Sequence, residues 1–368
     1  MKKKNLCKTL LKTMCIVLGI LILALLAYIV YLYASYYRIE DNQELVVEAP
    51  VDDTTTGAAA VLATDTEYSA VTYNIGFGAY LPDYSFFMDG GTSSWAESPE
   101  TVQYAINGAG ELVKSLDPDF ALIQEIDLDA TRSYHTDEYE MLRNILPEYT
   151  TVFAQNYDSA FLFYPFTQPH GSSRAGLGLF SKYPVSSALR RSFPISTSFS
   201  KFFDLDRCYS VSRIPVDNGK ELVIFNLHMS AYGNSDAIRK GQIEMLCNDM
   251  AKEYEAGNYV LCGGDFNHDL KASEEDTESC ESWAFPFPRT ELPEHFAFCL
   301  DLLSSEEKKA LWNSARNADM EYVPGVTYTV TLDGFIISDN IECLSYENVN
   351  TGYSYSDHDP VKVEFVLR

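Results

Sequence analysis

The sequence predicts an α/β fold in which two β-sheets pack face to face with helices on the outside, preceded by one N-terminal transmembrane helix. Three observations support this prediction: an uncharged apolar run lies near the N-terminus, many short β-type runs follow it, and two helices can be recognised among them. The chain has 368 residues, of which 46% are hydrophobic and 22% charged, as is typical of a globular protein and not of a disordered one.

The first element is the mostly apolar run at residues 13–37, which contains no charged side chain and exceeds the roughly 20 helical residues needed to cross a bilayer core. Residues 1–12 carry five lysines and no acidic residue. Because positive flanks stay in the cytoplasm, we expect residues 1–12 inside the cell and everything after residue 37 outside. A cleaved signal peptide is the alternative, but the run is longer than a typical signal core and no small-x-small cleavage site follows it.

Residues 38–66 form the next segment, which mixes acidic residues with Thr and Ala and shows no sustained period. It is interpreted as a tether or a packed lead-in. We expect the folded domain to span residues 67–368. No internal repeat and no second linker interrupt that stretch, so the sequence predicts one domain, which we expect to act as a monomer.

Within this domain, nine runs rich in Val, Ile, Phe and Tyr are predicted strands. They are SAVTYNI, DFALIQEI, GLGLFS, CYSVSRIPV, ELVIFNLHM, NYVLCGGDF, TYTVT, LDGFIIS and PVKVEFVL. One helix is predicted to start at the Ser98 cap with Pro99 in its first turn and to end at Asp117, before Pro118. A second covers residues 235–256 and stops at Gly257. A doubly wound parallel fold is the alternative, but residues 151–230 lack the helices that it needs between strands.

Charge and cysteine content narrow the classes of function. After residue 37 the chain has 22 Lys and Arg against 53 Asp and Glu, a formal charge of −31. Proteins that grip duplex nucleic acid neutralise its phosphates with basic side chains, so strong duplex DNA binding is not expected. The six cysteines of this region lack zinc-ligand spacing. We expect mostly buried free thiols, with Cys280 and Cys299 as the one pair considered for a disulfide.

Polar residues stand repeatedly at the ends of the predicted strands, where one rim of a sheet could bring them together. Taken singly, each is more often a solvated turn residue or a structural residue than a catalyst. Their joint occurrence at the edges of apolar strands favours a site. They are Asn74, Glu125, Asn226, His228, Asp265, Asn267, Asp333, Asp357 and His358.

These residues lie in motifs that resemble those of the endonuclease/exonuclease/phosphatase family, which includes DNase I-like nucleases, abasic-site nucleases, inositol polyphosphate 5-phosphatases and neutral sphingomyelinases. The motifs are YNI (73–75), QEID (124–127), GLGLFSKYPV (176–185), NLHMS (226–230), GGDFN (263–267), LDGFIIS (332–338) and SDHDP (356–360). They follow the family's order and span nearly the whole domain. The resemblance implies a four-layer α/β sandwich of two packed mixed sheets flanked by helices.

The resemblance also implies a divalent cation, usually Mg²⁺, with Mn²⁺ or Ca²⁺ as alternatives; hard oxygen ligands suit these ions. Glu125 matches the principal metal-binding glutamate of the family. Asn74 would contact the metal or its water, and Asp357 of the terminal motif is assigned to the metal as well.

The remaining motif residues imply the catalytic groups. Asp265 and Asn267 match the pair that orients the attacking water and the phosphate, and His228 matches a histidine that contacts the phosphate or protonates the leaving oxygen. His358 would be oriented by Asp333, whose carboxylate raises the imidazole pKa and selects its tautomer. The general base stays open between Asp265 and the His358–Asp333 pair.

Two arginines in the run DRCYSVSRI, Arg207 and Arg213, are weaker candidates for phosphate binding. A surface or structural role is equally compatible with either. His135 and His170 are interpreted as loop residues that face solvent, with substrate contact as the alternative.

The sequence thus predicts a membrane-anchored, extracytoplasmic, metal-dependent hydrolase of phosphodiesters or phosphomonoesters. The substrate could be a lipid head group, a nucleotide or nucleic acid, and the anchor slightly favours lipid. An extracellular nuclease of the same family is one alternative, and a catalytically silent surface binding module is another.

Overall fold

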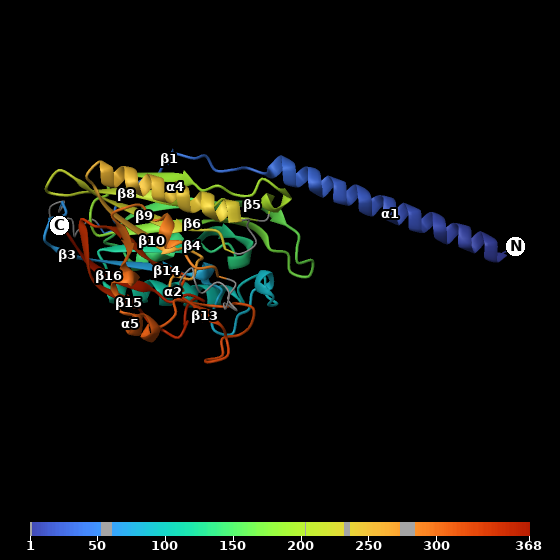
Figure 1. Cartoon of the computed structure of the whole chain (residues 1–368). Coiled ribbons are helices and arrows are strands. Elements are labelled where there is room, and N and C mark those ends of the chain that lie inside the picture. Colours follow the sequence, from blue (N-terminus) through green and yellow to red (C-terminus); the bar gives the residue numbers. More distant parts are fainter. Residues whose placement is uncertain (1, 53–60, 203, 232–235, 273–283) are drawn as a thin grey trace. The chain divides into compact units, whose positions relative to one another are not determined.

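The computed structural model describes residues 2–52, 61–202, 204–231, 236–272 and 284–368. The chain divides into two compact units, Met1–Arg38 and Ile39–Arg368. The first unit is the helix α1, Lys2–Ser35 (Figure 1). Its segment Leu6–Ser35 is long and apolar enough to cross a membrane, although a signal sequence would meet the same criteria of length and composition.

The second unit contains two seven-stranded mixed sheets. The first sheet has the order β1-β7-β8-β9-β10-β14-β11, and the second has the order β15-β16-β3-β4-β6-β5-β2. The strands of the first sheet are Gln43–Glu44 (β1), Ser187–Ser192 (β7), Cys208–Pro215 (β8), Glu221–His228 (β9), Tyr259–Asp265 (β10), Asp333–Ser338 (β14) and Phe296–Phe298 (β11). Those of the second are Ile341–Asn348 (β15), Val361–Leu367 (β16), Glu67–Asn74 (β3), Phe120–Ala130 (β4), Gly171–Ser181 (β6), Thr150–Leu162 (β5) and Val47–Glu48 (β2).

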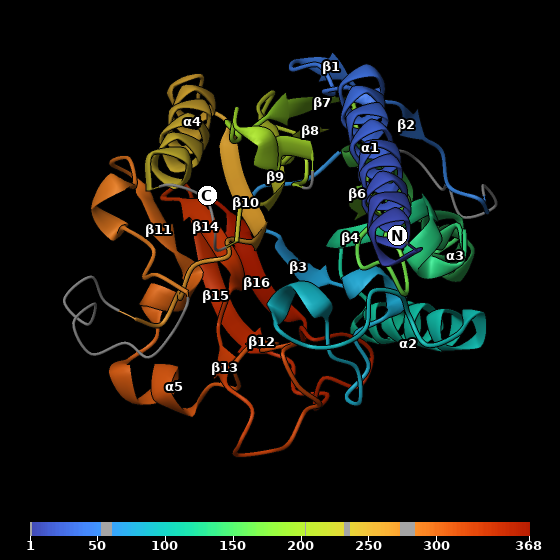
Figure 2. The same cartoon turned by 90° about the vertical axis from the view of Figure 1, so that its right-hand side faces the viewer.

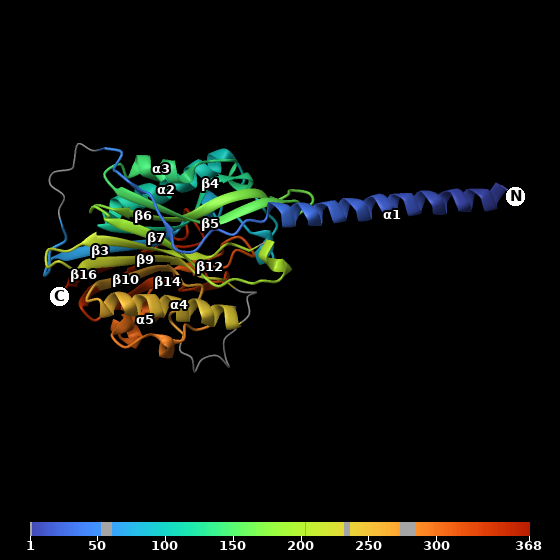
Figure 3. The same ribbon diagram turned by 90° about the horizontal axis from the view of Figure 1, so that it is seen from above.

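The helices cover the outer faces of the two sheets. Figures 2 and 3 show α2 (Pro99–Leu116) and α3 (Glu138–Ile145) on one side of the sandwich, and α4 (Asp236–Glu255) on the opposite side. The short helix α5 (Ser305–Ala310) and a small two-stranded sheet of β12 (Ala315–Arg316) and β13 (Thr329–Val330) complete the unit. The predicted four-layer α/β sandwich is confirmed, and the doubly wound alternative is wrong.

The alternation of side chains along β4 shows how the layers are built. Phe120 and Leu122 join the core between the two sheets, whereas Ala121 and Ile123 join the core beneath α2 and α3. Successive residues of a strand point to opposite faces, so a strand that is apolar throughout can fill both cores.

The ends of α2 follow the sequence signals. The Ser98 hydroxyl accepts the backbone N–H of Thr101 at 3.1 Å, and Pro99 occupies the first turn. Asp117 ends the helix in the left-handed conformation, with φ 47°. The second predicted helix corresponds to α4, and its first predicted residue, Ser235, lies outside the described residues.

The segment after α1 packs on the domain and does not hang free at its start. Strand β1 pairs with β7, and β2 pairs with β5, so this short stretch touches both sheets. The backbone N–H of Ile39 donates to the carboxylate of Asp206 at 2.5 Å. Residues 53–60, in the middle of the predicted tether, lie outside the described residues.

A buried arginine holds this segment in place. Arg190 is fully buried and donates to the backbone carbonyls of Gln155 at 2.7 Å, Asp206 at 2.9 Å and Glu40 at 3.1 Å. We expect Arg190→Met to reduce the free energy of unfolding by about 3–5 kcal/mol, because it removes a buried cation and leaves these acceptors without donors. Urea denaturation followed by tryptophan fluorescence measures the loss. Arg174→Met, on the exposed part of β6, is the matched control and should cost less than about 0.5 kcal/mol; equal effects would contradict the assignment.

The cysteines of the described part of the domain are free thiols, as expected. Cys208, Cys247, Cys262 and Cys299 are buried and Cys343 is half-buried. Cys280, one member of the pair considered for a disulfide, lies outside the described residues. The neighbour of Cys299 is Cys343, and a hydrogen bond between the two thiols raises the pKa of Cys299 and lowers that of Cys343.

Candidate active site

The register of the first sheet places three of the predicted site residues side by side. Asp265, the last residue of β10, lies opposite His228 at the end of the parallel strand β9. It also lies opposite Asp333, the first residue of the antiparallel strand β14. Three segments that are far apart in sequence therefore meet at one edge of one sheet, as predicted from the strand ends.

The second sheet contributes Asn74 from the end of β3 and Glu125 from the middle of β4, not from a strand end as the sequence predicted. Asn74 ends β3 and pairs with Gln124 of β4. At the next residue the β4–β6 register shifts, and Glu125 adopts φ 57°. A non-glycine residue in this left-handed region is strained, and such strain often marks a functional position. The bulge turns Glu125 out of the strand's regular alternation.

Asn74 joins the two halves of the site. Its amide Nδ2 donates to Glu125 Oε1 at 3.2 Å and to Asp265 Oδ2 at 3.1 Å. Its Oδ1 accepts the backbone N–H of Gly76 at 3.0 Å, so the amide holds two carboxylates in place. Deeper in the sandwich, Gln124 Nε2 donates to Asn226 Oδ1 at 2.8 Å and ties the sheets together. Asn226 is thus a structural residue beneath the site.

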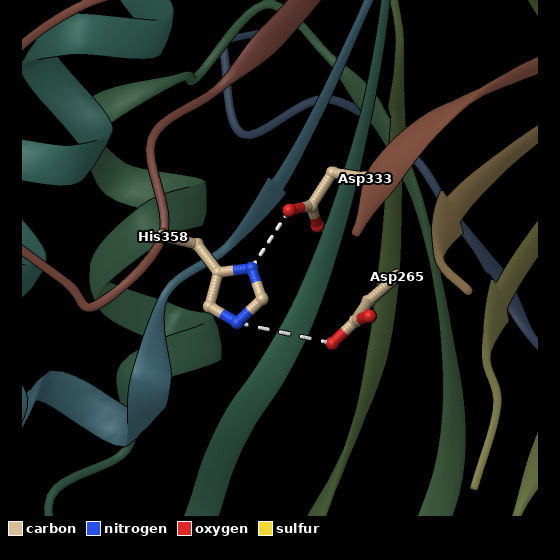
Figure 4. Close-up of side chains that lie close together, drawn as sticks. All are labelled: Asp265, Asp333 and His358. Atoms are coloured by element: carbon tan, nitrogen blue, oxygen red, sulfur yellow. Dashed lines mark hydrogen bonds and ion pairs between the residues drawn. The ribbon is translucent and has the colours of Figure 1, made fainter. Parts of the chain in front are cut away.

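Asp333 and His358 form a buried pair (Figure 4). His358 Nδ1 lies 2.7 Å from Asp333 Oδ2, which also accepts the hydroxyl of Ser314 at 2.7 Å. The other ring nitrogen, Nε2, faces Asp265 Oδ2 at 3.9 Å. Burial disfavours the charged ring, but Asp333, with Asp357 and Asp265, raises the pKa of His358 well above its ordinary value. The neighbouring carboxylates therefore favour the imidazolium form of His358.

The pKa of His228 is shifted in the opposite direction to that of His358. Its Nε2 lies 3.5 Å from Asp265 Oδ2 and 3.8 Å from Glu125 Oε1. Burial, together with the charges of Arg207 and His358, lowers the pKa of His228 well below its ordinary value. The site thus contains one neutral and one protonated imidazole on either side of Asp265, which is the arrangement that separate acid–base roles require.

Asp265 is the central carboxylate. Its Oδ1 accepts the backbone N–H of Asn267 at 2.8 Å. Asn267 itself adopts φ 51° and donates its side-chain amide to the carbonyl of Met229 at 2.9 Å, which orients the amide. Burial, partly offset by His358, raises the pKa of Asp265. A carboxylate with a raised pKa accepts a proton more readily than an ordinary one.

The expected divalent cation fits the acidic side of the site. Burial, with the charge of Glu125 among the further causes, raises the pKa of Asp357 to about 6. Burial, followed by the charges of Asp357 and Glu125, raises the pKa of Asp89 to about 7. The partners of the Glu125 carboxylate are the Asn74 amide and the neutral His228. Carboxylate oxygens are the hard ligands that suit Mg²⁺.

These groups line one cavity of about 400 Å³. Besides the predicted catalytic and metal-binding residues, its wall includes further residues that were not assigned to the site from the sequence. They include Phe77, Tyr80, Phe86, Met88, Asp89, Arg132, Asn156, Tyr157, His170 and Arg316. His170 was expected in solvent but is buried, and burial lowers its pKa to about 3. Its position in the QPHG run gave no signal of this, because the β5–β6 hairpin folds it back onto the cavity.

The two candidate arginines separate in the structure. Arg207 is buried and lines the cavity. Arg213 lies further along β8, where its guanidinium binds Glu221 at 2.8 Å and Glu253. The structure therefore does not bring Arg213 to the site. His135 is an exposed residue that contacts Asp129 at 2.5 Å, as expected of a loop histidine.

Fold and site together define a metal-dependent hydrolase of phosphoester bonds. The sequence matches the endonuclease/exonuclease/phosphatase family over residues 71–301, and the chain belongs to that family. No curated relative matches the sequence.

Solved structures share the fold at low sequence identity. The endonuclease/exonuclease/phosphatase from Beutenbergia cavernae DSM 12333 has a TM-score of 0.54 at 15% identity, covering 82% of this chain and 72% of its own. The 2′,3′-cyclic phosphatase ANGEL2, in complex with adenosine-2′,3′-vanadate, has a TM-score of 0.56 at 12% identity and coverages of 82% and 96%. D. rerio TDP2 with a single-strand DNA product has a TM-score of 0.54 at 13% identity and coverages of 82% and 99%.

Proposed function

We propose that this protein is a membrane-anchored, extracytoplasmic, Mg²⁺-dependent phosphoesterase that hydrolyses its substrate by in-line attack of water. The observation that carries the proposal is the convergence of Glu125, Asp265 and the Asp333–His358 pair on one cavity. The bound cation would be held by Glu125 and Asp357 and would neutralise charge on the phosphate oxygens.

The protonation states favour Asp265 over His358 as the general base. Asp333 raises the pKa of His358 and so favours its imidazolium form, which is a poorer proton acceptor than the neutral ring. Asp265 is ionisable and has a raised pKa, so it takes the proton of the attacking water. The His358 imidazolium then stabilises the negative charge that develops on the phosphate.

The other predicted residues have positioning roles in this proposal. Asn74 holds Glu125 and Asp265 at a fixed separation through its two N–H bonds. His228 is neutral and contributes an N–H toward the phosphate or the leaving oxygen. Asn267 fixes Asp265 through its backbone N–H, and its side-chain amide, held by Met229, faces the substrate.

The membrane location rests on α1 and the five lysines before its apolar run. We expect the full chain to stay in the membrane fraction after extraction with alkaline carbonate, and its C-terminal part to be digested by protease added to intact cells. Release into the soluble fraction, or a mature chain that lacks residues 1–37, would show a cleaved signal peptide instead. Protection of the domain from protease would reverse the proposed topology.

The reaction itself is tested with the full chain in detergent micelles. We expect hydrolysis of bis(4-nitrophenyl) phosphate or 4-nitrophenyl phosphate that is lost on chelation by EDTA and restored by excess Mg²⁺, because the acidic groups of the cavity need a cation. The same preparation is then assayed on sphingomyelin, phosphoinositides, nucleotides, RNA and plasmid DNA. A preparation that binds Mg²⁺ but turns over none of these would favour the silent binding module.

A nucleic-acid substrate is the second candidate, because one of the similar structures holds a single-strand DNA product. The formal charge of −31 after residue 37 disfavours an extended duplex, whose binding relies on basic side chains. A single-stranded end remains compatible with a cavity of about 400 Å³.

A further inference from the structure

The cavity that contains the catalytic residues is also lined by two polar side chains that have no role in the proposed reaction. Asn156, on β5, is 1% exposed, and neither its Nδ2 nor its Oδ1 has a hydrogen-bond partner among the described residues. Arg207, just before β8, is 6% exposed, and its Nε and Nη1 also lack partners there. Both line the cavity that contains Glu125 and Asp265. A buried polar group without a partner is destabilising, so such groups call for a ligand.

The fold brings these two residues together from different sheets. Cys208 Sγ lies 3.8 Å from the carbonyl oxygen of Gln155, and these two residues are the direct chain neighbours of Arg207 and Asn156. Arg190 spans the same place, since it donates to the carbonyls of both Gln155 and Asp206. The two unpartnered side chains are therefore placed by a rigid junction between β5 and β8.

The unpartnered N–H donors of Arg207 and Asn156 favour the binding of an anion. The other two guanidinium groups in the cavity wall are already engaged: Arg132 binds the Asp127 carboxylate at 2.8 Å and 3.1 Å, and Arg316 donates to backbone carbonyls including that of Leu81 at 2.8 Å. Arg207 keeps donors for a ligand, and the amide of Asn156 adds N–H donors. Guanidinium and amide donors together are the usual surroundings of a bound phosphate.

We propose that Asn156 and Arg207 form a binding site for a second phosphate group of the substrate. This inference rests on the proposed function, since the first phosphate is the one cleaved at Asp265 and His358. It deepens that function by naming the class of substrate: a phosphoester that carries another phosphate close to the scissile one. A cavity of about 400 Å³ is the size of a pocket for one small ligand, so the doubly phosphorylated group enters as a single unit.

The test uses the full chain in micelles at a fixed free Mg²⁺ concentration. The probes are methylene-, ethylene-, propylene- and butylenediphosphonate, each compared with the monophosphonate of the same carbon chain. They are not hydrolysed, and the series scans the spacing of two phosphate-like groups. Binding is measured by calorimetry, and inhibition by the hydrolysis of bis(4-nitrophenyl) phosphate. We expect at least one diphosphonate to bind about tenfold more tightly than its monophosphonate, as one charge-assisted site would provide.

Variants test whether the preference for a diphosphonate depends on Asn156 and Arg207. Arg207→Gln and Asn156→Ala should reduce it to about twofold or less, whereas Arg207→Lys should keep part of it. Arg174→Gln, which removes an exposed arginine, should leave it unchanged. If no diphosphonate is preferred by the wild type, or if Arg207→Gln and Arg207→Lys both retain the full preference, the inference is wrong. A thermal melt checks the fold of each variant. If Arg207→Gln does not fold, the diphosphonate preference of Arg207→Lys is used in its place.

The test of the second phosphate site can fail or succeed independently of the test of the proposed function. Failure to hydrolyse bis(4-nitrophenyl) phosphate would count against the phosphoesterase, while the calorimetric comparison would still judge the phosphate site. If Arg207→Gln instead raises KM for the reporter as much as it weakens the diphosphonate, Arg207 binds the scissile phosphate and the second site does not exist.

Discussion

Replacing Glu125 with glutamine is expected to lower kcat/KM by about a thousandfold, since loss of several kcal/mol of charge stabilisation at the phosphate corresponds to that factor. Glutamine keeps the size of the side chain and can still interact with the Asn74 amide, but it removes the negative charge. The bulge that places Glu125 at φ 57° is a feature of the backbone and should persist. The effect therefore reports on the cation and not on folding.

Steady-state kinetics over a range of Mg²⁺ concentrations measures this loss. The apparent Mg²⁺ requirement should rise in the variant, because Asp357 and its neighbours then hold the cation with one charge fewer. Glu221→Gln is the matched control: it lies at the opposite end of β9, where it binds Arg213, and should change kcat/KM by less than about threefold. An unchanged activity and Mg²⁺ requirement in Glu125→Gln would remove this residue from the site.

Breaking the Asp333–His358 pair is expected to have a second large effect. His358→Ala should lower kcat by about 10²–10⁴-fold, the range typical of a positioned acid–base group. Asp333→Asn should lower it by a similar factor, because the asparagine cannot balance the imidazolium and also disturbs the ring orientation that the 2.7 Å contact maintains. Full activity in either variant would contradict the assignment.

The pH profile distinguishes loss of charge from loss of structure. The protonated form of His358 is present below its raised pKa and is lost as the pH rises through that value. Asp333→Asn removes the main cause of the raised pKa, so the alkaline limb of log(kcat/KM) should move to lower pH. The acid limb, assigned to Asp265, should also move to lower pH, because the charge of Asp333 is among the causes that raise the pKa of Asp265. An alkaline limb that does not move would show that His358 is not the titrating group.

A matched control exists on the surface of the same domain. His295 and Asp339 form an exposed pair with the same atoms in contact, Nδ1 to Oδ2 at 2.6 Å. Exposed ion pairs contribute little, so Asp339→Asn should leave kcat, its pH profile and the stability nearly unchanged. The contrast between the two Asp→Asn variants isolates the effect of burial beside the cavity.

Much of the fold could be predicted from local patterns. The continuous apolar strands β9, β10 and β14 were predicted from their own residues, as was α2 from Ser98, Pro99 and Asp117. Strands β5, β7 and β15 were missed. The exposed positions of β15 carry Glu, Leu and Ser, and β5 mixes polar with apolar residues, so neither has the composition of a buried strand.

The residue types of the site could be predicted from the sequence. Which candidate residues belong to the site could be predicted only in part. The structure brings the predicted residues to one region. Asn74, His228, Asp265 and Asp333 stand at strand ends, Glu125 stands at a bulge within β4, and Asn267, Asp357 and His358 stand beside strands. Arg207 and Arg213 could not be separated from sequence, because both are basic residues at one strand. Five residues of β8 separate Arg207 from Arg213, and only the packing of that strand decides which arginine lines the cavity.

The sequence by itself determined the apolar N-terminal helix and the order of the motifs, because a helix of sufficient length and a strand end are both local properties of the chain. It also determined the residue types that phosphoester hydrolysis requires. Tertiary structure alone decided that Asn156 and His170 line the cavity, and that Arg190 ties the segment after α1 to both sheets. These outcomes depend on the register between strands distant in sequence and on burial, and neither is encoded in any single segment.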